Sequence, residues 1–257
     1  MLKKDSPLRQ LPRGLSARQI VYLDALRLSA EIADQAYGEL VTEVQTLSAL
    51  SECPDGTHDP VPAVRHAWSF IDSLHRFRAV LQQAPGVKHN SVYELFMRQT
   101  DPAKRMRDVA QHLNNELSGI AERAQGAYGT LTWVVGAGDD LVPTACMVNA
   151  GTAYGRVLGP VTDFEERLPS GEIHHLRIEL GKRVLMISDA HGHLVSLVRS
   201  FEAAIGKLAD RNQRYGSDQV FNLTFRHAQQ DAPAAEETES TPGERRTPQR
   251  FLRAPQT

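Results

Sequence analysis

Hydrophobic residues recur at helical spacing through the first half of this chain of 257 residues. Ser16 and Gln19 form a capping box, in which the serine caps an N–H of the first turn and the glutamine bonds back to the serine backbone. Apolar residues then follow at intervals of three, four or seven: Ile20, Leu23, Ala30, Ala33, Tyr37, Leu40, Val44, Leu47 and Leu50. This stripe predicts one long amphipathic helix over about 16–50.

Two shorter helices are expected after a turn-rich break. Asp59 can cap a second helix that begins at Pro60, and Pro85-Gly86 ends it. Ser91 and Glu94 have the spacing of a capping box and open a short third helix. The buried face of the second helix is expected to consist of Val64, Trp68, Ile71, Leu74, Phe77 and Leu81.

A fourth helix begins at Asp101-Pro102 and is expected to run over about 102–124. Its inner stripe consists of Met106, Val109, Leu113, Leu117 and Ile120. Because the connections between these helices are short, neighbouring helices should be antiparallel. The pattern therefore predicts an antiparallel four-helix bundle over 16–126.

The hydrophobic period changes at Gly126 to one that favours strands. The expected elements are strands at 130–135 and 144–149, a second hairpin of 173–180 and 184–187, a helix over about 189–212 capped by Ser188, and a last strand from Val220 to Phe225. These elements predict a small α+β unit over 127–227, with hairpins and one helix.

The expected fold class is thus α+β, with four segments along the chain. They are a flexible arm over 1–15, the helical bundle over 16–126, the α+β unit over 127–227 and a disordered tail over 228–257. No true linker can be placed between the two central segments, so a shared core is also compatible with the pattern.

The composition is that of a soluble globular protein, with 41% hydrophobic and 23% charged residues. The formal net charge of -2 gives no overall positive field, so contact with nucleic acid would need a local basic patch. No apolar run reaches the ~20 residues of a membrane-spanning helix, and no apolar segment follows the basic start. We therefore expect a cytoplasmic protein without membrane contact. Cys53 and Cys146 are too widely spaced for a disulfide framework or a zinc motif.

The fourth helix carries the clearest candidate chemistry. Asp108 and His112 are one turn apart and share its polar face, and Arg107 lies on the adjacent line. A guanidinium can grip a phosphate with paired donors, and an imidazole can move a proton near neutral pH. Asp108 could orient that imidazole. The three residues would suffice for attack of an RNA 2′-hydroxyl on the adjacent phosphorus, without a metal ion.

These residues resemble the motif of the HEPN superfamily of small helical-bundle proteins. Its members carry Arg, a polar residue, a few further positions and then His in a late helix of the bundle. Arg107, Asp108 and His112 match the shortest spacing, although asparagine is commoner than aspartate after the arginine. The resemblance covers about 16–125. Many members are metal-independent ribonucleases that pair two motifs across a homodimer, often as toxins, and others are inactive binding modules. The resemblance implies RNA as the substrate, no metal or cofactor, and a homodimer or an inhibitor protein as partner.

Three alternatives stay open from the sequence. The same polar residues are compatible with a solvated helix face, and the long apolar stripe is compatible with a non-enzymatic interaction or scaffold protein. A metal site could involve His174, His191 and His193. If the second helix packs against the fourth, His75 or Arg78 is expected to border the Arg107/His112 surface.

Overall fold

The computed structural model of the chain describes residues 1–50, 59–122, 126–136, 143–149, 151 and 169–208. The expected α+β fold is confirmed. Its elements are α1 (Ala17–Leu50), α2 (Val61–Gln83), α3 (Ser91–Gln99), α4 (Asp101–Gln111), α5 (Leu113–Ala121), β1 (Thr130–Val135), β2 (Thr144–Asn149), β3 (Ile173–Leu180), β4 (Arg183–Met186) and α6 (Ile187–Leu208). The strand expected at Val220 to Phe225 and the tail expected over 228–257 lie outside the described residues.

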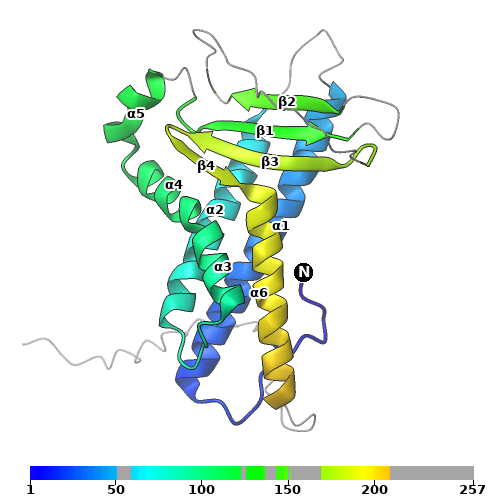
Figure 1. Ribbon diagram of the computed structural model, residues 1–257, viewed down its shortest axis with the longest axis vertical. Coiled ribbons are helices and arrows are strands. Elements are labelled where there is room, and N and C mark those ends of the chain that lie inside the picture. The colour runs from blue at the N-terminus through cyan, green and yellow to red at the C-terminus, as the bar shows by residue number, and fades with distance from the viewer. Residues whose placement is uncertain (51–58, 123–125, 137–142, 150, 152–168, 209–257) are drawn as a thin grey trace, which may run out of the picture. The chain divides into compact units, whose positions relative to one another are not determined.

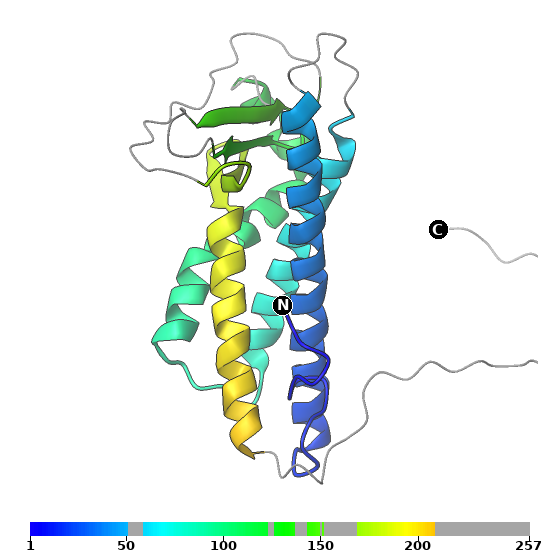
Figure 2. The ribbon, with the colours of Figure 1, turned by 90° about the vertical axis from the view of Figure 1, so that its right-hand side faces the viewer.

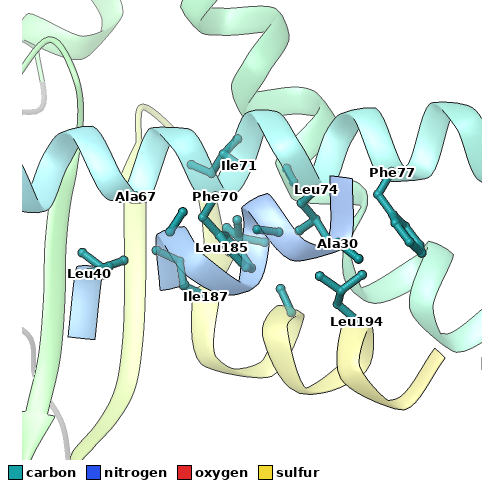
Figure 3. Close-up of a cluster of buried hydrophobic side chains, with 14 of the residues drawn as sticks. Ala30, Leu40, Ala67, Phe70, Ile71, Leu74, Phe77, Leu185, Ile187 and Leu194 are labelled. Atoms are coloured by element: carbon teal, nitrogen blue, oxygen red, sulfur yellow. The ribbon is translucent and has the colours of Figure 1, made fainter. Parts of the chain in front are cut away.

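The long helices α1 and α2 pack side by side, and α6 runs alongside them and contacts α1 and α3 (Figures 1 and 2). Small side chains line the seam between α1 and α2, where Ala30, Ala33 and Ala67 are fully buried. Phe70 and Leu194 fill the adjoining space toward α6 (Figure 3). None of the helices in the described ranges combines the length and the apolar content that a membrane crossing requires.

The four strands form one antiparallel sheet in the order β2-β1-β3-β4. The sheet lies at the end of the bundle where α1 ends and α2 begins (Figure 1). Hydrogen bonds from two indole groups connect the sheet and the segment before β1 to the helices. The Nε1 of Trp133 in β1 donates to the hydroxyl of Ser48 in α1 at 2.8 Å, and the Nε1 of Trp68 in α2 donates to the carbonyl of Tyr128 at 3.0 Å.

Helices and sheet share one hydrophobic core. Residues 1–218 form one compact unit, and its cluster of buried residues joins Leu40 of α1 to Leu185 of β4 and Ile187 of α6 (Figure 3). The boundary expected at residue 126 therefore falls inside a single packed unit. The reason is that α6, which follows the sheet in sequence, returns to pack against α1 and α3.

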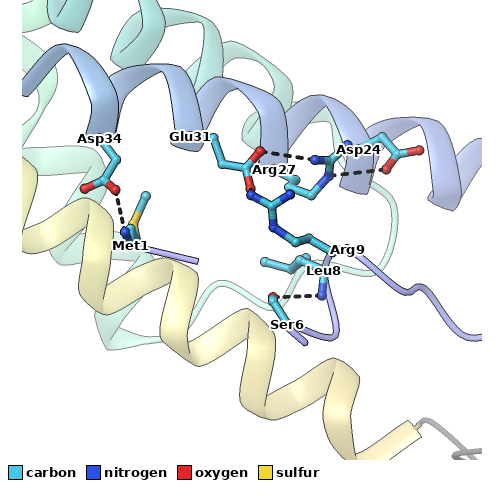
Figure 4. A network of polar contacts seen from close by, with 8 residues as sticks. All are labelled: Met1, Ser6, Leu8, Arg9, Asp24, Arg27, Glu31 and Asp34. Atoms are coloured by element: carbon cyan, nitrogen blue, oxygen red, sulfur yellow. Dashed lines mark hydrogen bonds and ion pairs between the residues drawn. The ribbon is translucent and has the colours of Figure 1, made fainter. Parts of the chain in front are cut away.

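Residues 1–15 are packed against the helices, whereas the sequence pattern indicated a flexible arm. Leu8 and Leu11 are only 2% and 4% exposed. The guanidinium of Arg9 pairs with Glu31 of α1, and the amino group of Met1 lies 2.5 Å from the carboxylate of Asp34 (Figure 4). The prolines and charges suggested a solvated segment, but two leucines are enough to anchor it in the core.

Of the three helix starts at which the sequence predicts a serine cap, one agrees with the structure and two differ. Ser16 and Gln19 form the expected capping box, with backbone N–H bonds of 3.0 and 3.3 Å to each other's side chains. The third helix is capped by Asn90, one residue before the expected Ser91. Ser188 lies within the first turn of α6, and its hydroxyl accepts a backbone N–H of β3 at 3.2 Å.

A substitution at Gly129 tests the close backbone contact between the start of β1 and β3. Its φ is +89°, and a Cβ at this position would lie 2.6 Å from the backbone oxygen of Glu179. We expect Gly129→Ala to lower the free energy of unfolding by about 2 kcal/mol or more, because both the dihedral and the backbone contact oppose a side chain. Urea denaturation followed by circular dichroism measures this change.

Gly119→Ala is the matched control, since Gly119 lies inside α5 and a Cβ there would meet no described atom within 4 Å. Alanine favours a helix interior over glycine by up to about 1 kcal/mol, so this variant should be as stable as the wild type or more stable. Equal stability of the two alanine variants would contradict the β1–β3 geometry.

Candidate functional site

The helix that carries the sequence motif is divided at His112. α4 ends at Gln111, His112 has φ -118° and ψ 34°, and α5 begins at Leu113. The N–H of His112 still bonds to the carbonyl of Asp108 at 3.2 Å, so these two residues stay one turn apart. The single helix expected over 102–124 is therefore two helices. Leu117, expected to face inward, is 44% exposed.

Arg107 is bound to other side chains of the protein. Its Nε donates to the Oδ1 of Asp72 in α2 at 2.8 Å. When the amide of Gln111 is oriented to satisfy both of its ends, its oxygen accepts from both Nη atoms of Arg107 at 3.0 and 3.1 Å. All three nitrogens of the guanidinium thus have partners within the protein, and an incoming phosphate would have to compete with them.

Asp72 joins Arg107 to a second arginine on its own helix. The Nη2 of Arg76 lies 2.6 Å from the Oδ2 of Asp72, one turn along α2. Burial alone would raise the pKa of Asp72, but the hydrogen bond from Arg107 and the positive charges of Arg76 and Arg107 outweigh this effect and lower it. Asp72 is therefore the anionic centre that holds α4 against α2.

His75 borders this contact, as the packing of the second helix against the fourth was expected to place it. It lies three residues after Asp72 on α2, and its Nδ1 is buried without a hydrogen-bond partner among the described residues. Burial lowers the pKa of His75, and the charge of Arg107 lowers it further, while Asp108 and Asp72 act in the opposite direction. The net effect is a pKa of His75 below the ordinary value for histidine, which favours the neutral imidazole.

Arg78, the other residue considered for this surface, has a structural position instead. Its guanidinium donates to the carbonyl of Met97 and to the hydroxyl of Thr100, both at 2.5 Å, and lies 3.4 Å from the carboxylate of Asp101. It is 6% exposed, and burial lowers its pKa. Arg78 therefore fixes the junction between α3 and α4 and is not presented to a ligand.

Asp108 and His112 are exposed at the edge of this region. Neither side chain has a hydrogen bond or ion pair with another described residue. We call the charged region between the two helices the α2–α4 polar cluster; its members are Asp72, His75, Arg76, Arg107, Asp108 and Gln111. Two arginines and two aspartates balance in it, so the cluster is not a basic patch.

Two of the three histidines considered for a metal site, His191 and His174, have other contacts. The Nε2 of His191 lies 2.8 Å from Asp34, and its ring stacks on Tyr37 with centroids 3.9 Å apart. His174 lies 3.7 Å from the carboxylate of Glu172. Over the described ranges, no three His, Cys, Asp or Glu side chains are grouped so that they could hold a metal ion.

α1 is apolar on two sides, and only one of them is covered. The buried side consists of Leu26, Ala30, Ala33, Tyr37, Leu40, Val44 and Leu47. A second stripe with alternating spacings of three and four, which we call the outer α1 face, consists of Arg18, Val21, Ala25, Leu28, Ile32, Gln35 and Glu39. At 100° per residue the two stripes lie about 120° apart around the helix. Val21, Leu28 and Ile32 are 66%, 46% and 50% exposed.

A groove of about 400 Å³ runs beside the outer α1 face, between α1 and α2. It is lined by Ala25, Leu28, Ser29 and Ile32 from α1 and by Ser69, Asp72, Ser73 and Arg76 from α2. Its α1 wall is mainly apolar, and its α2 wall ends in two members of the α2–α4 polar cluster. Our sequence interpretation missed this surface. The seven-residue repeat from Arg18 to Glu39 was the signal that could have identified it.

A second pocket, of about 370 Å³, lies between the last turns of α1 and the sheet. Cys146 and Ser48 are among its lining residues. Burial raises the pKa of the Cys146 thiol, and a hydrogen bond with Ser48 offsets part of that rise. The thiol is therefore not activated as a nucleophile.

Comparison of the chain with protein-family models, with curated proteins and with solved structures finds no match.

The titration of His75 tests the electrostatics of the polar cluster. We expect NMR to give His75 a pKa below the ordinary value for histidine. Arg107→Gln should raise that pKa by removing a nearby positive charge, and Asp108→Asn should lower it by removing a negative one. Arg105→Gln is the matched control, because Arg105 pairs with Asp101 on the same helix and should leave the titration unchanged. An equal pKa of His75 in the wild type and the three variants would contradict an electrostatic influence of Arg107 and Asp108 on His75.

Proposed function

We propose that this chain is a non-enzymatic interaction protein that binds a helix of another polypeptide over its outer α1 face. The observation that carries the proposal is the exposure of Val21, Leu28 and Ile32 along one side of a single helix. Single exposed apolar residues are ordinary, but a contiguous apolar stripe beside a groove is characteristic of a binding surface.

The spacing of the stripe favours a helix as the bound element. Side chains at alternating intervals of three and four present a seam into which the side chains of a second helix can insert. The groove between α1 and α2 adds depth along the same line, with Leu28 and Ile32 on its α1 wall. An amphipathic helix in an apolar groove is a recurring mode of protein recognition.

The α2–α4 polar cluster supports this proposal indirectly. The guanidinium of Arg107 is occupied by Asp72 and Gln111, and its charge is balanced within the cluster. In this arrangement Arg107 connects α4 to α2 and is not open to a ligand. The outer α1 face is then the more accessible candidate surface.

A pull-down with variants of the outer α1 face tests the proposal. We expect tagged wild-type protein to retain a discrete partner, which can be another copy of the chain, and Leu28→Glu to lose it, because the charge cannot be buried in an apolar seam. Leu117→Glu is the matched control, since Leu117 is an exposed leucine of α5, away from this face. Retention of the same proteins by all three would contradict an interaction through the outer α1 face.

A second candidate is a HEPN-like, metal-independent endoribonuclease that acts at the α2–α4 polar cluster. The observation in its favour is the exposed imidazole of His112, close in sequence to Arg107 and without a polar partner among the described residues. In this mechanism His112 moves the proton of the RNA 2′-hydroxyl, Arg107 contacts the phosphate, and Asp108 orients His112. The phosphate would displace Asp72 from Arg107.

RNA cleavage in the presence of EDTA tests this second candidate. If it holds, wild-type protein cleaves RNA, and His112→Ala and Arg107→Ala each lower the rate by about 100-fold or more. Arg105→Ala is the matched control, since it removes another arginine of α4 that pairs with a carboxylate. Absence of cleavage by the wild type across varied RNAs, or equal cleavage by all four proteins, would leave only the interaction function.

A further inference from the structure

We propose that the outer α1 face pairs, in antiparallel orientation, with the same face of a second copy of this chain. The inference rests on the proposed interaction function and identifies its partner. It is argued from the order of residues within the outer α1 face, from the charges at the two ends of that face and from the groove beside it.

The order of residues along the outer α1 face makes it complementary to itself when one copy is reversed. In an antiparallel pair of helices, the two alternating positions of a seven-residue repeat face each other. With the two-fold axis between Ala25 and Leu28, Val21 faces the partner copy's position 32, and Ala25 faces its position 28. The four central layers are then entirely apolar, and each sets a smaller residue against a larger one.

Polar residues stand at both ends of this apolar centre, and they select the antiparallel orientation. Arg18 lies at one end, and Gln35 and Glu39 lie at the other, where Glu39 also contacts the Nδ1 of His66 in α2 at 2.8 Å and accepts from the Nε2 of Gln35 at 2.8 Å. In the antiparallel pair, Arg18 faces the partner copy's position 35 and lies one turn from its position 39. In a parallel pair, each Arg18 would face another Arg18, and each Glu39 another Glu39, which repel.

The remaining charges near the outer α1 face are compensated within each copy. Asp24 and Glu31 flank the face, but Asp24 lies 3.7 Å from the guanidinium of Arg27, and Glu31 pairs with both Arg27 and Arg9 (Figure 4). These pairs limit the repulsion between the acidic flanks of two approaching copies.

The groove beside the outer α1 face gives the partner's side chains a place to insert. Its α1 wall contains Ala25 and Ser29, whose small side chains permit close approach of a second helix. Leu28 and Ile32 line the groove and are also 46% and 50% exposed, so the same residues can contribute both the ridge of one copy and the wall that receives the ridge of the other. This reciprocity is what a two-fold interface requires.

Measurement of the oligomeric state tests the pairing. We expect light scattering to find a dimer whose fraction rises with concentration, and Leu28→Glu and Ile32→Glu each to weaken dimerisation by at least about tenfold. Because both side chains are about half exposed, the variants should keep the circular dichroism spectrum and the unfolding transition of the wild type. Leu117→Glu should dimerise as the wild type does. A monomeric wild type, or a dimer that both glutamate variants leave unchanged, would overturn the proposal.

Disulfide cross-linking tests the orientation. Arg18→Cys and Gln35→Cys should each give no more covalent dimer than the wild type, which carries Cys53 and Cys146 as the baseline. A mixture of the two variants should give a covalent heterodimer, because the two positions face each other only in the antiparallel pair. Cross-linking of each variant with itself would indicate a parallel pair and contradict the proposal.

Two outcomes distinguish failure of the dimer from failure of the interaction function. If the wild type is monomeric but captures a protein that the Leu28→Glu variant does not capture, a second copy of the chain is excluded as the partner and the interaction function stands. If the wild type is monomeric and no captured protein depends on Leu28, both proposals fail.

Discussion

The close packing of α1 against α2 is the constraint on which the rest of the unit depends. Ala30, Ala33 and Ala67 are fully buried, and their small side chains let the two long helices approach closely. α6 can then cover the same seam through Leu194, and the sheet can rest on the end of the pair through Trp133. A larger residue in the seam would separate the helices and move every element that is fastened to them.

Two arginines then fix the shorter helices on this frame, and the position of one of them limits its chemistry. Arg78 of α2 holds the junction between α3 and α4, and Arg107 of α4 returns to Asp72 of α2. The hydrogen bond between Arg107 and Asp72 holds α4 against α2. The same bond opposes phosphate binding, because a ligand must replace a partly buried carboxylate whose pKa is already lowered by these arginines. Stability and catalysis therefore compete for one guanidinium.

Much of the fold could be predicted from the sequence because periodicity reports which residues are buried. The bounds of β1, β2 and β3 were given by their alternating or apolar runs, and α1 by its capping box and long stripe. The break at His112 could not be predicted, since residues 101–121 keep one helical period through it. Glu116 of α5 contacts Arg183 of β4, which lies 67 residues later, and no local pattern indicates such a partner. The partner of Arg107 was likewise hidden, because Asp72 lies 35 residues earlier and no local pattern links them.

The amphipathicity of α1 is the feature that joins fold to function. A helix with apolar residues on one side is a surface helix, whereas a helix with apolar residues on opposite sides is normally enclosed between two layers. α2 and α6 supply one layer for α1, and the described residues leave Val21, Leu28 and Ile32 exposed on the other side. A second copy of α1 with its own α2 beside it would supply the missing layer. The proposed pairing would thus account for the second apolar stripe of α1, which folding of one chain leaves exposed.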